Sequence, residues 1–352
     1  MSTAVRNGRI VTGANPFAVR PEGDRLQTPR LDIPHWGETM YFHVWNPEQG
    51  VGIWIHTGRC PEKLDLWWAQ TVALLPGGRL LMDRSWGYPG DDSGPATENL
   101  RIRNEEPLTN WTLHYDGAGE ATTTEAAAAG PVGAGPCLPF QFEVTLAALT
   151  PVWDMDAALG IGDDLGWAHM HHEQALSATG TLTTTDGRYR LDGVSFRDHS
   201  CGPRDFTNLG GDQFFNAVSP SGRVAHGLIN WKQDDKVDHR TFAICENGRY
   251  ELFPRGEMSG IADRVRHEPR DITVTVGGGD QGATTLRGRW LHGFTVSLLE
   301  PNVNINGAAS FHPDPLILTE GIIEWTWPDG EVGWGKFERD YRLRMIPSPD
   351  PR

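Results

Sequence analysis

Nine consecutive residues, 197–205, bring together most of the side-chain types that proton-transfer chemistry needs, and they read Arg-Asp-His-Ser-Cys-Gly-Pro-Arg-Asp. A positioned carboxylate and imidazole can move protons in a transition state, which contributes roughly 10²- to 10⁴-fold in rate. We therefore predict that Asp198 and His199 act as an acid/base pair. The alternative is a structural turn in which the arginines and aspartates of this segment only neutralise one another.

The neighbouring arginines decide which member of the pair would donate the proton. A cation beside a carboxyl group lowers its pKa by roughly 1 to 3 units, so Asp198 next to Arg197 or Arg204 would stay ionised and His199 would be the acid. If Asp198 faced an apolar pocket instead, its pKa would rise and it could donate the proton itself. We favour the first arrangement, in which Asp198 orients His199 as the carboxylate does in a catalytic triad.

The densest histidine cluster lies upstream, where residues 169–173 read His-Met-His-His-Glu. In an extended segment His169, His171 and Glu173 project on one side and His172 on the other. Two imidazoles and a carboxylate are a common metal ligand set, but the same residues suit a hydrogen-bonding cluster near a domain boundary. We predict no metal site at these histidines.

The four cysteines show no Cys-x-x-Cys spacing, which indicates reduced thiols rather than a zinc or redox motif. Cys201 stands beside His199 and two arginines, and such neighbours can lower the pKa of a thiol. A nucleophilic Cys201 is therefore an alternative, although the sequence offers no third group to orient the histidine.

Strand patterns surround these clusters on both sides. Residues 40–45 and 51–55 alternate around the turn at 46–50, and residues 67–75 and 79–82 flank Pro76-Gly77-Gly78, so both pairs predict hairpins. Residues 111–115 and 140–149 predict further strands, whereas 88–96 and 117–136 are typical of loops, with one helical turn at Ala126–Ala129. His43 and His56 fall on the aromatic faces of the first hairpin, where they would be either cavity-lining or simply packed.

The second half repeats this β pattern, with turn signals such as Asp186-Gly187 and Asn247-Gly248. Residues 187–196 and 212–218 predict strands on either side of a rigid corner at 197–205 that Gly202-Pro203 stiffens. The glycines and aspartates of 153–167 break the strand pattern. We therefore predict an all-β protein of two β-barrel-like halves, residues 1–160 and 161–352, with no internal repeat in the sequence itself.

Residues Asp198-His199-Ser200-Cys201-Gly202 resemble the Asp-His-x-Trp-Gly element of the lipocalin-like proteins that include hydroxyneurosporene synthase (carotenoid hydratase) and the lipocalin-like Diels-Alderases. In that family the element begins a strand in the second of two barrel-like halves. The resemblance implies a lipocalin-like fold, a role for His199 in activity, and a place for Glu173 in the same cavity as a third catalytic group. The sequence departs from the family at Cys201, so the role of the family's tryptophan does not carry over.

Composition excludes several classes of function. The 352 residues carry a formal net charge of −15, which argues against nucleic acid and anionic membrane surfaces. Neither an apolar leader nor an 18-residue apolar run occurs, so we expect a cytoplasmic protein without a membrane span. No dinucleotide fingerprint, P-loop or nucleophile elbow is present, which favours chemistry without a cofactor.

Together these patterns predict hydration, dehydration or isomerisation of a hydrophobic terpenoid-, steroid- or aromatic-like molecule. The 14 tryptophans and the barrel-like halves suit an aromatic-lined pocket. The predicted substrate-binding residues are His172, Arg204, His226, Trp231, Trp325, His43 and His56. A pericyclase and a non-catalytic binding protein stay open as alternatives, as does the formation of a homo-oligomer.

Overall fold

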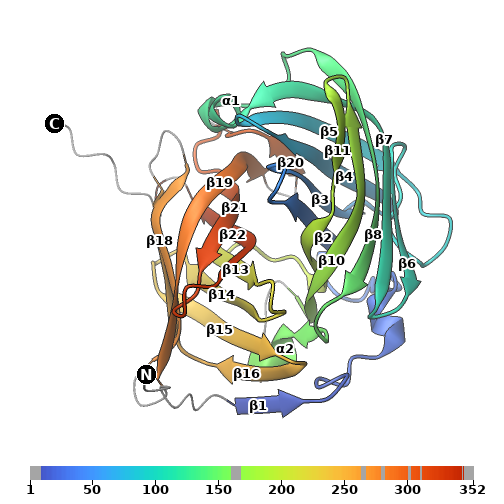
Figure 1. The fold of residues 1–352 in the computed structure, drawn as a ribbon. Coiled ribbons are helices and arrows are strands. Elements are labelled where there is room, and N and C mark those ends of the chain that lie inside the picture. The colour runs from blue at the N-terminus through green and yellow to red at the C-terminus, as the bar shows by residue number, and fades with distance from the viewer. Residues whose placement is uncertain are drawn as a thin grey trace. The chain divides into compact units, whose positions relative to one another are not determined.

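A computed structural model describes residues 9–159, 168–262, 267–278, 282–299, 303–309, 311–342 and 344. Most of the described chain forms two large antiparallel sheets, and the helices are short: η1 Pro21–Asp24, α1 Thr124–Ala129 and α2 Met155–Leu159 (Figure 1). The predicted all-β class is confirmed. Residues 160–167, which include the predicted boundary residues Gly162, Asp163 and Trp167, lie outside the described part.

The chain divides into two compact units. Unit 2 comprises Ala14–Thr122 and Gly133–Phe206, and unit 1 comprises Met1–Gly13, Thr123–Val132 and Thr207–Arg352. Unit 1 consists mainly of the C-terminal part of the chain, and it also contains two short segments from the N-terminal half. One of them contains α1, whose Ala127 carbonyl accepts a hydrogen bond of 2.8 Å from the Ala308 amide of unit 1.

The sheet of unit 2 closes on itself as a barrel. Its strands follow the order β10-β12-β2-β3-β4-β5-β7, and β8 completes the ring by pairing with both β7 and β10. The ring strands are β2 Trp36–Asn46, β3 Val51–Cys60, β4 Lys63–Leu75, β5 Arg79–Gly87, β7 Asn110–Thr123, β8 Cys137–Ala148, β10 Met170–Thr184 and β12 Gly193–Pro203. The short strands β6 Leu100–Glu106, β9 Trp153–Asp154 and β11 Gly187–Arg190 pair with its members.

Side chains alternate between the two faces of each strand, so every second side chain points into the barrel and fills it. On β2, Met40, Phe42 and Val44 belong to the apolar core inside the ring, so Tyr41 and His43 project from its outer face. Because residues on both faces are buried, β2 shows no alternation in exposure. Both predicted hairpins are confirmed by the β2–β3 and β4–β5 pairs.

The structure divides the chain differently from the predicted boundary at residues 160 and 161. Strands β10 and β12 close the first barrel, because β10 pairs with β8 and β12 pairs with β2 as far as Pro203 opposite Trp36. Most of the 197–205 segment is thus strand rather than a corner. Gly202 is needed for close approach, since it has φ +143 and a Cβ there would overlap the backbone nitrogen of His169.

Unit 1 contains an open, curled sheet in the order β1-β16-β15-β14-β13-β22-β21-β19-β18-β17, with β20 paired to β19. Strands from both ends of this sheet contribute side chains to the apolar core of unit 1. In that core Trp325 is fully buried beside Phe215 and Phe337. The strands are β1 Arg9–Thr12, β13 Leu209–Val218, β14 Val224–Lys232, β15 Val237–Glu246, β16 Arg249–Phe253, β17 Gly256–Ala262, β18 Pro269–Gly277, β19 Ala283–Leu299, β20 Val303–Asn306, β21 Leu316–Thr326 and β22 Val332–Arg342.

The loop predictions are confirmed in part. Residues 88–96 form a loop that carries one isolated bridge, at Ala96. The alanine run forms the end of α1, and Gly130 caps it. Residues 117–123, by contrast, extend β7 because β8 pairs with them from Gly117 opposite Phe140 to Glu120 opposite Cys137.

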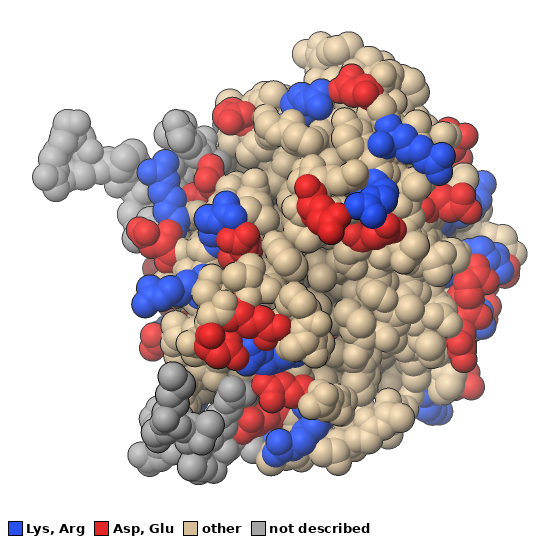
Figure 2. Space-filling view, viewed as in Figure 1, with Lys and Arg blue, Asp and Glu red and all other residues tan. Residues whose placement is uncertain are grey.

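Charge is dispersed over the face drawn in Figure 2, where Lys and Arg alternate with Asp and Glu instead of gathering by sign. Among the described residues, no helix has the length and apolar character needed to cross a membrane.

Candidate functional site

A row of polar side chains crosses the outer face of the unit 2 barrel. Its members are direct cross-strand partners on β10, β12, β2, β3, β4 and β5, so their side chains project on the same face as neighbours. This polar row consists, in order, of Glu173, Asp198, Tyr41, His56, Gln70 and Arg84. Asp198, His56 and Arg84 are partly exposed, whereas the other three members are buried.

Aromatic rings flank the polar row on both sides. The His56 ring makes edge contacts with Trp54 at 5.8 Å and with Trp68 at 5.1 Å, and Tyr41 meets Trp54 at 5.8 Å. The Tyr41 hydroxyl also lies 3.0 Å from Nδ1 of His43, whose ring stacks on Phe196. The arrangement places hydrogen-bonding groups among buried aromatic side chains, a combination of residue types that small-molecule sites also have.

One end of the polar row carries an acid/base cluster. His171 lies two residues before Glu173 on the same face of β10, and its Nε2 is 3.5 Å from Oε1 of Glu173. Burial lowers the pKa of His171, but the nearby carboxylates of Glu173, Asp198 and Asp156 outweigh burial and raise the pKa above its ordinary value. The protonated imidazole is thereby favoured beside two carboxylates of the polar row.

His199 projects into the barrel, away from the face that carries Asp198, because successive strand residues alternate. Its Nε2 is 2.9 Å from Oε1 of Glu38, and Oε2 of Glu38 accepts a hydrogen bond of 2.8 Å from Arg59. His199 and Glu38 have no exposed surface. The predicted orientation of His199 by Asp198 is therefore corrected: its carboxylate partner is Glu38.

Arg197 also projects into the barrel. Its Nη2 is 2.7 Å from Oδ1 of Asp24, it donates two hydrogen bonds to the side-chain oxygen of Gln174, and its guanidinium lies over the ring of Trp111. We call Asp24, Glu38, Arg59, Arg197 and His199 the interior network. Its buried charges are paired, as buried charges must be to be tolerated.

Arg204 directly follows β12, and its guanidinium turns back to the end of that strand. Its Nη2 donates to the carbonyl and hydroxyl of Ser200 and to the Thr39 hydroxyl at 2.9, 3.1 and 3.2 Å. Burial lowers the pKa of Arg204, and the charges of Cys201, Asp198 and Glu38 partly offset this effect. Arg204 thus senses the charge of Asp198, whereas Arg197 pairs with Asp24 inside the barrel.

The other predicted residues are dispersed. His172 lies inside the barrel opposite His199, and burial, followed by His199, Arg197 and His171, holds its pKa well below the usual value. His226, Trp231 and Trp325 belong to unit 1, where Trp325 fills the core, Trp231 packs against it, and the His226 ring contacts Tyr250.

The neighbours of Cys201 do not lower the pKa of its thiol, as the alternative of a nucleophilic Cys201 would require. Burial, followed by the Glu38 charge, raises the pKa of this thiol to about 12. Although Arg204 acts in the opposite direction, desolvation is the larger effect. A thiolate nucleophile at Cys201 is therefore disfavoured near neutral pH.

Sequence reasoning missed several residues of these networks. Glu38, Arg59 and Asp24 are far from the motif in sequence and meet it only through barrel closure. His171 was placed on one strand face with Glu173 and considered as a metal ligand or as part of a hydrogen-bonding cluster, but not as an acid. Tyr41 precedes the core residue Phe42 in the predicted hairpin. This alternation could have predicted that Tyr41 lies on the outer face of the strand.

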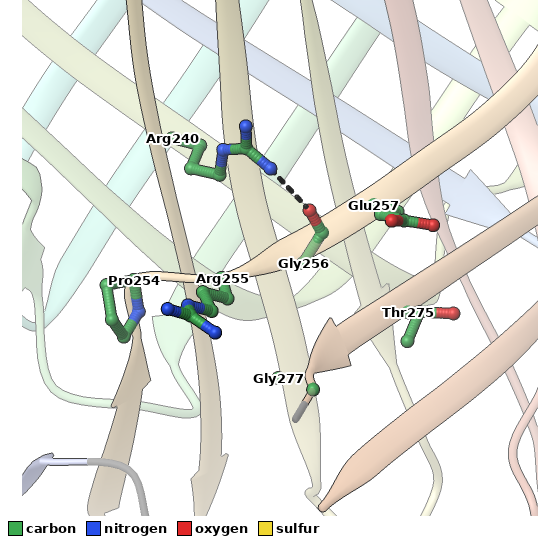
Figure 3. A pocket seen from close by; sticks show the side chains of 8 residues that line it. Arg240, Pro254, Arg255, Gly256, Glu257, Thr275 and Gly277 are labelled. Carbon is green, nitrogen blue, oxygen red and sulfur yellow. Dashed lines mark hydrogen bonds between the residues drawn. The ribbon is translucent and has the colours of Figure 1, made fainter. Parts of the chain in front are cut away.

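An open pocket in unit 1 contains none of the predicted site residues. It has a volume of about 550 Å³ and lies beside the start of β17. The guanidinium of Arg240 points at the Gly256 carbonyl, and the side chains of Arg255 and Glu257 point away from that contact (Figure 3). A second pocket, of about 490 Å³ in unit 2, borders the interior network through Gln27, whose amide donates to Glu38. Neither pocket has the aromatic lining of the polar row.

Comparisons with solved structures show the fold. The chain is similar to a candidate AttH protein from Nitrosomonas europaea, with a TM-score of 0.56 and 15% identity over 88% of this chain and 93% of that one. It is also similar to CghA crystallised with Sch210972, with a TM-score of 0.54 and 11% identity over 94% of this chain and 98% of that one. No curated protein matches the sequence significantly. One family model matches residues 20–340, and its description is a domain of unknown function, DUF7064.

Proposed function

Since the chain belongs to the DUF7064 family, which is defined without a function, we propose an activity from the site itself: a cofactor-independent acid/base enzyme that hydrates, dehydrates or isomerises a hydrophobic small molecule. The observation that carries the proposal is the cluster of His171, Glu173 and Asp198 on one face of β10 and β12, next to aromatic side chains.

In this mechanism His171 is the acid. Its imidazolium gives a proton to one carbon of a double bond, and the neighbouring carbon becomes electron-poor. In hydration, a water oxygen bonds to that carbon while Asp198 or Glu173 accepts the water's proton; dehydration is the reverse. In isomerisation the carboxylate instead removes a proton from the adjacent carbon. The proton donor and the proton acceptors that these steps need thus lie on one face of β10 and β12.

His199, the acid predicted from the sequence, receives a different role. Its fully buried imidazole is held by Glu38 inside the barrel, on the face of β12 opposite Asp198. We assign His199 to positioning: with Glu38 and Arg59 it fixes the strand whose other face presents Asp198. Glu173 and Asp198 stay catalytic residues in this proposal, but Asp198 now acts as a proton acceptor instead of orienting His199.

The substrate class follows from the flanks of the polar row. Trp54, Trp68 and Phe196 offer apolar ring surface, and Tyr41 and His43 add hydrogen-bonding groups. Such a lining suits a terpenoid-, steroid- or aromatic-like molecule with one or two polar groups. The likeness in fold to CghA, which was crystallised with Sch210972, supports the fold as a scaffold for ligands and goes no further.

Mass spectrometry tests the proposal in two stages. Molecules that co-purify with the full chain are identified first, and they and related polyenes are then incubated with the protein in H₂¹⁸O. Hydration places ¹⁸O in the product, and isomerisation in D₂O places deuterium at carbon. His171→Gln and Asp198→Asn should each lower turnover by at least about 10²-fold.

Glu143→Gln is the matched control, because it removes an exposed carboxylate from β8 of the same barrel. Its turnover should equal that of the wild type. Full turnover by His171→Gln would remove the proposed acid and contradict the mechanism.

A pericyclase is the second candidate. Tyr41, His56 and Gln70 occupy half of the polar row and can orient a substrate by hydrogen bonds without any change of charge. A pericyclase would incorporate no solvent isotope, and it would lose little activity in Asp198→Asn.

A further inference from the structure

Unit 1 contains a group of buried carboxylates that the proposed reaction does not use. Asp212 on β13 and Glu338 and Asp340 on β22 each place a carboxylate oxygen within 4.8 Å of the other two. All three side chains are buried, and Asp212 and Asp340 are direct partners across the β13–β22 pair. Like charges directly opposite one another destabilise a sheet.

The nearby charges do not remove this repulsion. The ammonium of Lys336 contacts Oε2 of Glu338 and lies 3.6 Å from Oε2 of Glu320, the cross-strand partner of Glu338. Burial, then the charges of Asp212, Glu338 and Glu320, nevertheless raise the pKa of Asp340 well above its usual value, and Lys336 offsets this only in part. Lys336 therefore offsets only part of the negative charge that acts on Asp340.

A second observation comes from the neighbouring strand. Asn230 on β14 is the direct partner of Asp212, so its side chain shares the face that carries the carboxylates. Only 2% of Asn230 is exposed, and its side-chain oxygen has no hydrogen-bond donor within the described part of the chain; the same holds for Oδ1 of Asp340. A proton on Asp340 could serve one such oxygen, whereas a metal cation can bind several at once.

We propose that Asp212, Glu338 and Asp340, together with the side-chain oxygen of Asn230, form a binding site for one hard divalent cation: Mg²⁺, Mn²⁺ or Ca²⁺. Every donor is a carboxylate or amide oxygen, the ligand type that these cations prefer. Glu338 can take part because Lys336 contacts its Oε2 and leaves Oε1 for the cation. The cation joins the three adjacent strands β14, β13 and β22.

The proposal goes beyond the proposed reaction, which takes place on unit 2 and uses no metal. It also differs from the metal hypothesis considered for the histidines at 169–172, since none of those residues takes part. A cation in unit 1 and proton transfer on the polar row are therefore tested by separate measurements.

Mn²⁺ is the probe in the first experiment. The full-length protein is freed of metal with EDTA and titrated with MnCl₂ at about 0.15 M salt, where exposed charges are screened beyond roughly 8 Å. Electron paramagnetic resonance of free Mn²⁺ should show saturable binding of one ion per chain, with competition by Mg²⁺ or Ca²⁺. The melting temperature should rise with the cation, because the ion binds only the folded site.

Asp340→Asn separates a metal site from a merely acidic cluster. Loss of a charged ligand should weaken Mn²⁺ binding by at least about 10-fold. The metal-free variant should melt at the wild-type temperature or above it, since the repulsion with Asp212 is relieved. Glu324→Gln on β21 is the control, because its carboxylate pairs with the exposed Arg289, and its Mn²⁺ affinity should be unchanged.

Two results would overturn the proposal. One is the absence of saturable Mn²⁺ binding by the wild-type chain, combined with a melting temperature that responds to pH but ignores all three cations; a shared proton would then occupy the site. The other is unchanged Mn²⁺ affinity in both Asp340→Asn and Asp212→Asn. Circular dichroism of each variant establishes that it is folded before it is titrated.

Discussion

Replacing Glu38 by glutamine should destabilise unit 2 far more than it slows the reaction. Glu38 has no exposed surface, and its carboxylate joins Nε of Arg59 at 2.8 Å and Nε2 of His199 at 2.9 Å. The variant leaves a buried guanidinium without its carboxylate. Breaking a buried ion pair in this way costs about 3–5 kcal/mol.

The remaining contacts of Arg59 favour the lower end of that range. Its guanidinium still donates to the carbonyls of Leu64 and Gln27 and stacks over Trp67 at 4.8 Å, and glutamine keeps one acceptor oxygen. We therefore expect a loss of about 3 kcal/mol. At roughly 2–4 °C per kcal/mol for a unit of about 150–250 residues, melting should shift by about 6–12 °C.

Hydrogen exchange followed by mass spectrometry measures the effect where it arises. Peptides from β2 and β12 report the opening of the barrel, and peptides from β21 and β22 of unit 1 provide an internal reference. Glu143→Gln, which removes an exposed carboxylate, should stay within about 0.5 kcal/mol of the wild type. A loss below about 1 kcal/mol in Glu38→Gln, the size of a surface ion pair, would refute the view that the interior network stabilises the barrel.

Three further predictions concern single groups. Turnover should fall as pH rises through the raised pKa of His171, because the protonated imidazole is lost there, and Glu173→Gln should move this fall to lower pH; an unmoved pH–rate profile would separate Glu173 from His171. Iodoacetamide near pH 8 should modify the exposed Cys137 of the folded protein and spare Cys201, whose pKa is raised to about 12; peptide mass spectrometry reads the ratio, and rapid labelling of Cys201 would contradict its burial. Gly202→Ala should lower the free energy of unfolding by at least about 2 kcal/mol, because its φ of +143 and the His169 backbone exclude a side chain. Gly90→Ala has open space around it and should change that free energy by less than about 1 kcal/mol. Equal urea midpoints for the two variants would argue against the strained strand end.

Local patterns predicted the strands well and their long-range partners poorly. The hairpin of residues 40–55 could be read from alternation and a turn, and its register confirms this, with Asn46 opposite Val51. The pairing of β12 with β2 could not be read in this way, because it joins segments about 160 residues apart and depends on barrel closure. The boundary at 160 was therefore placed before two strands that complete the first barrel.

The same limit applies to the site. Alternation alone implies that Asp198 and His199 face opposite ways once their segment is a strand, but Gly202-Pro203 indicated a turn, where neighbours can share a face. Glu173 was placed beside Asp198 through the family resemblance, and the two are direct partners. Glu38 could not be found from the sequence, since only tertiary structure brings it to His199.

The path of the chain between the two units has a consequence for protease cleavage. Residues 123–132 leave the barrel between β7 and β8 and are anchored in unit 1 through the Ala308 amide and through the Thr124 hydroxyl, which donates to the Gly293 carbonyl at 2.6 Å. A single cut near residue 206 would therefore leave the two products linked by a peptide that is continuous with β7 and β8. Separate fragments would require additional cuts on both sides of α1 and another near residue 13, because β1 also belongs to unit 1, where it pairs with β16. A nicked protein should therefore migrate as an intact one until it is denatured.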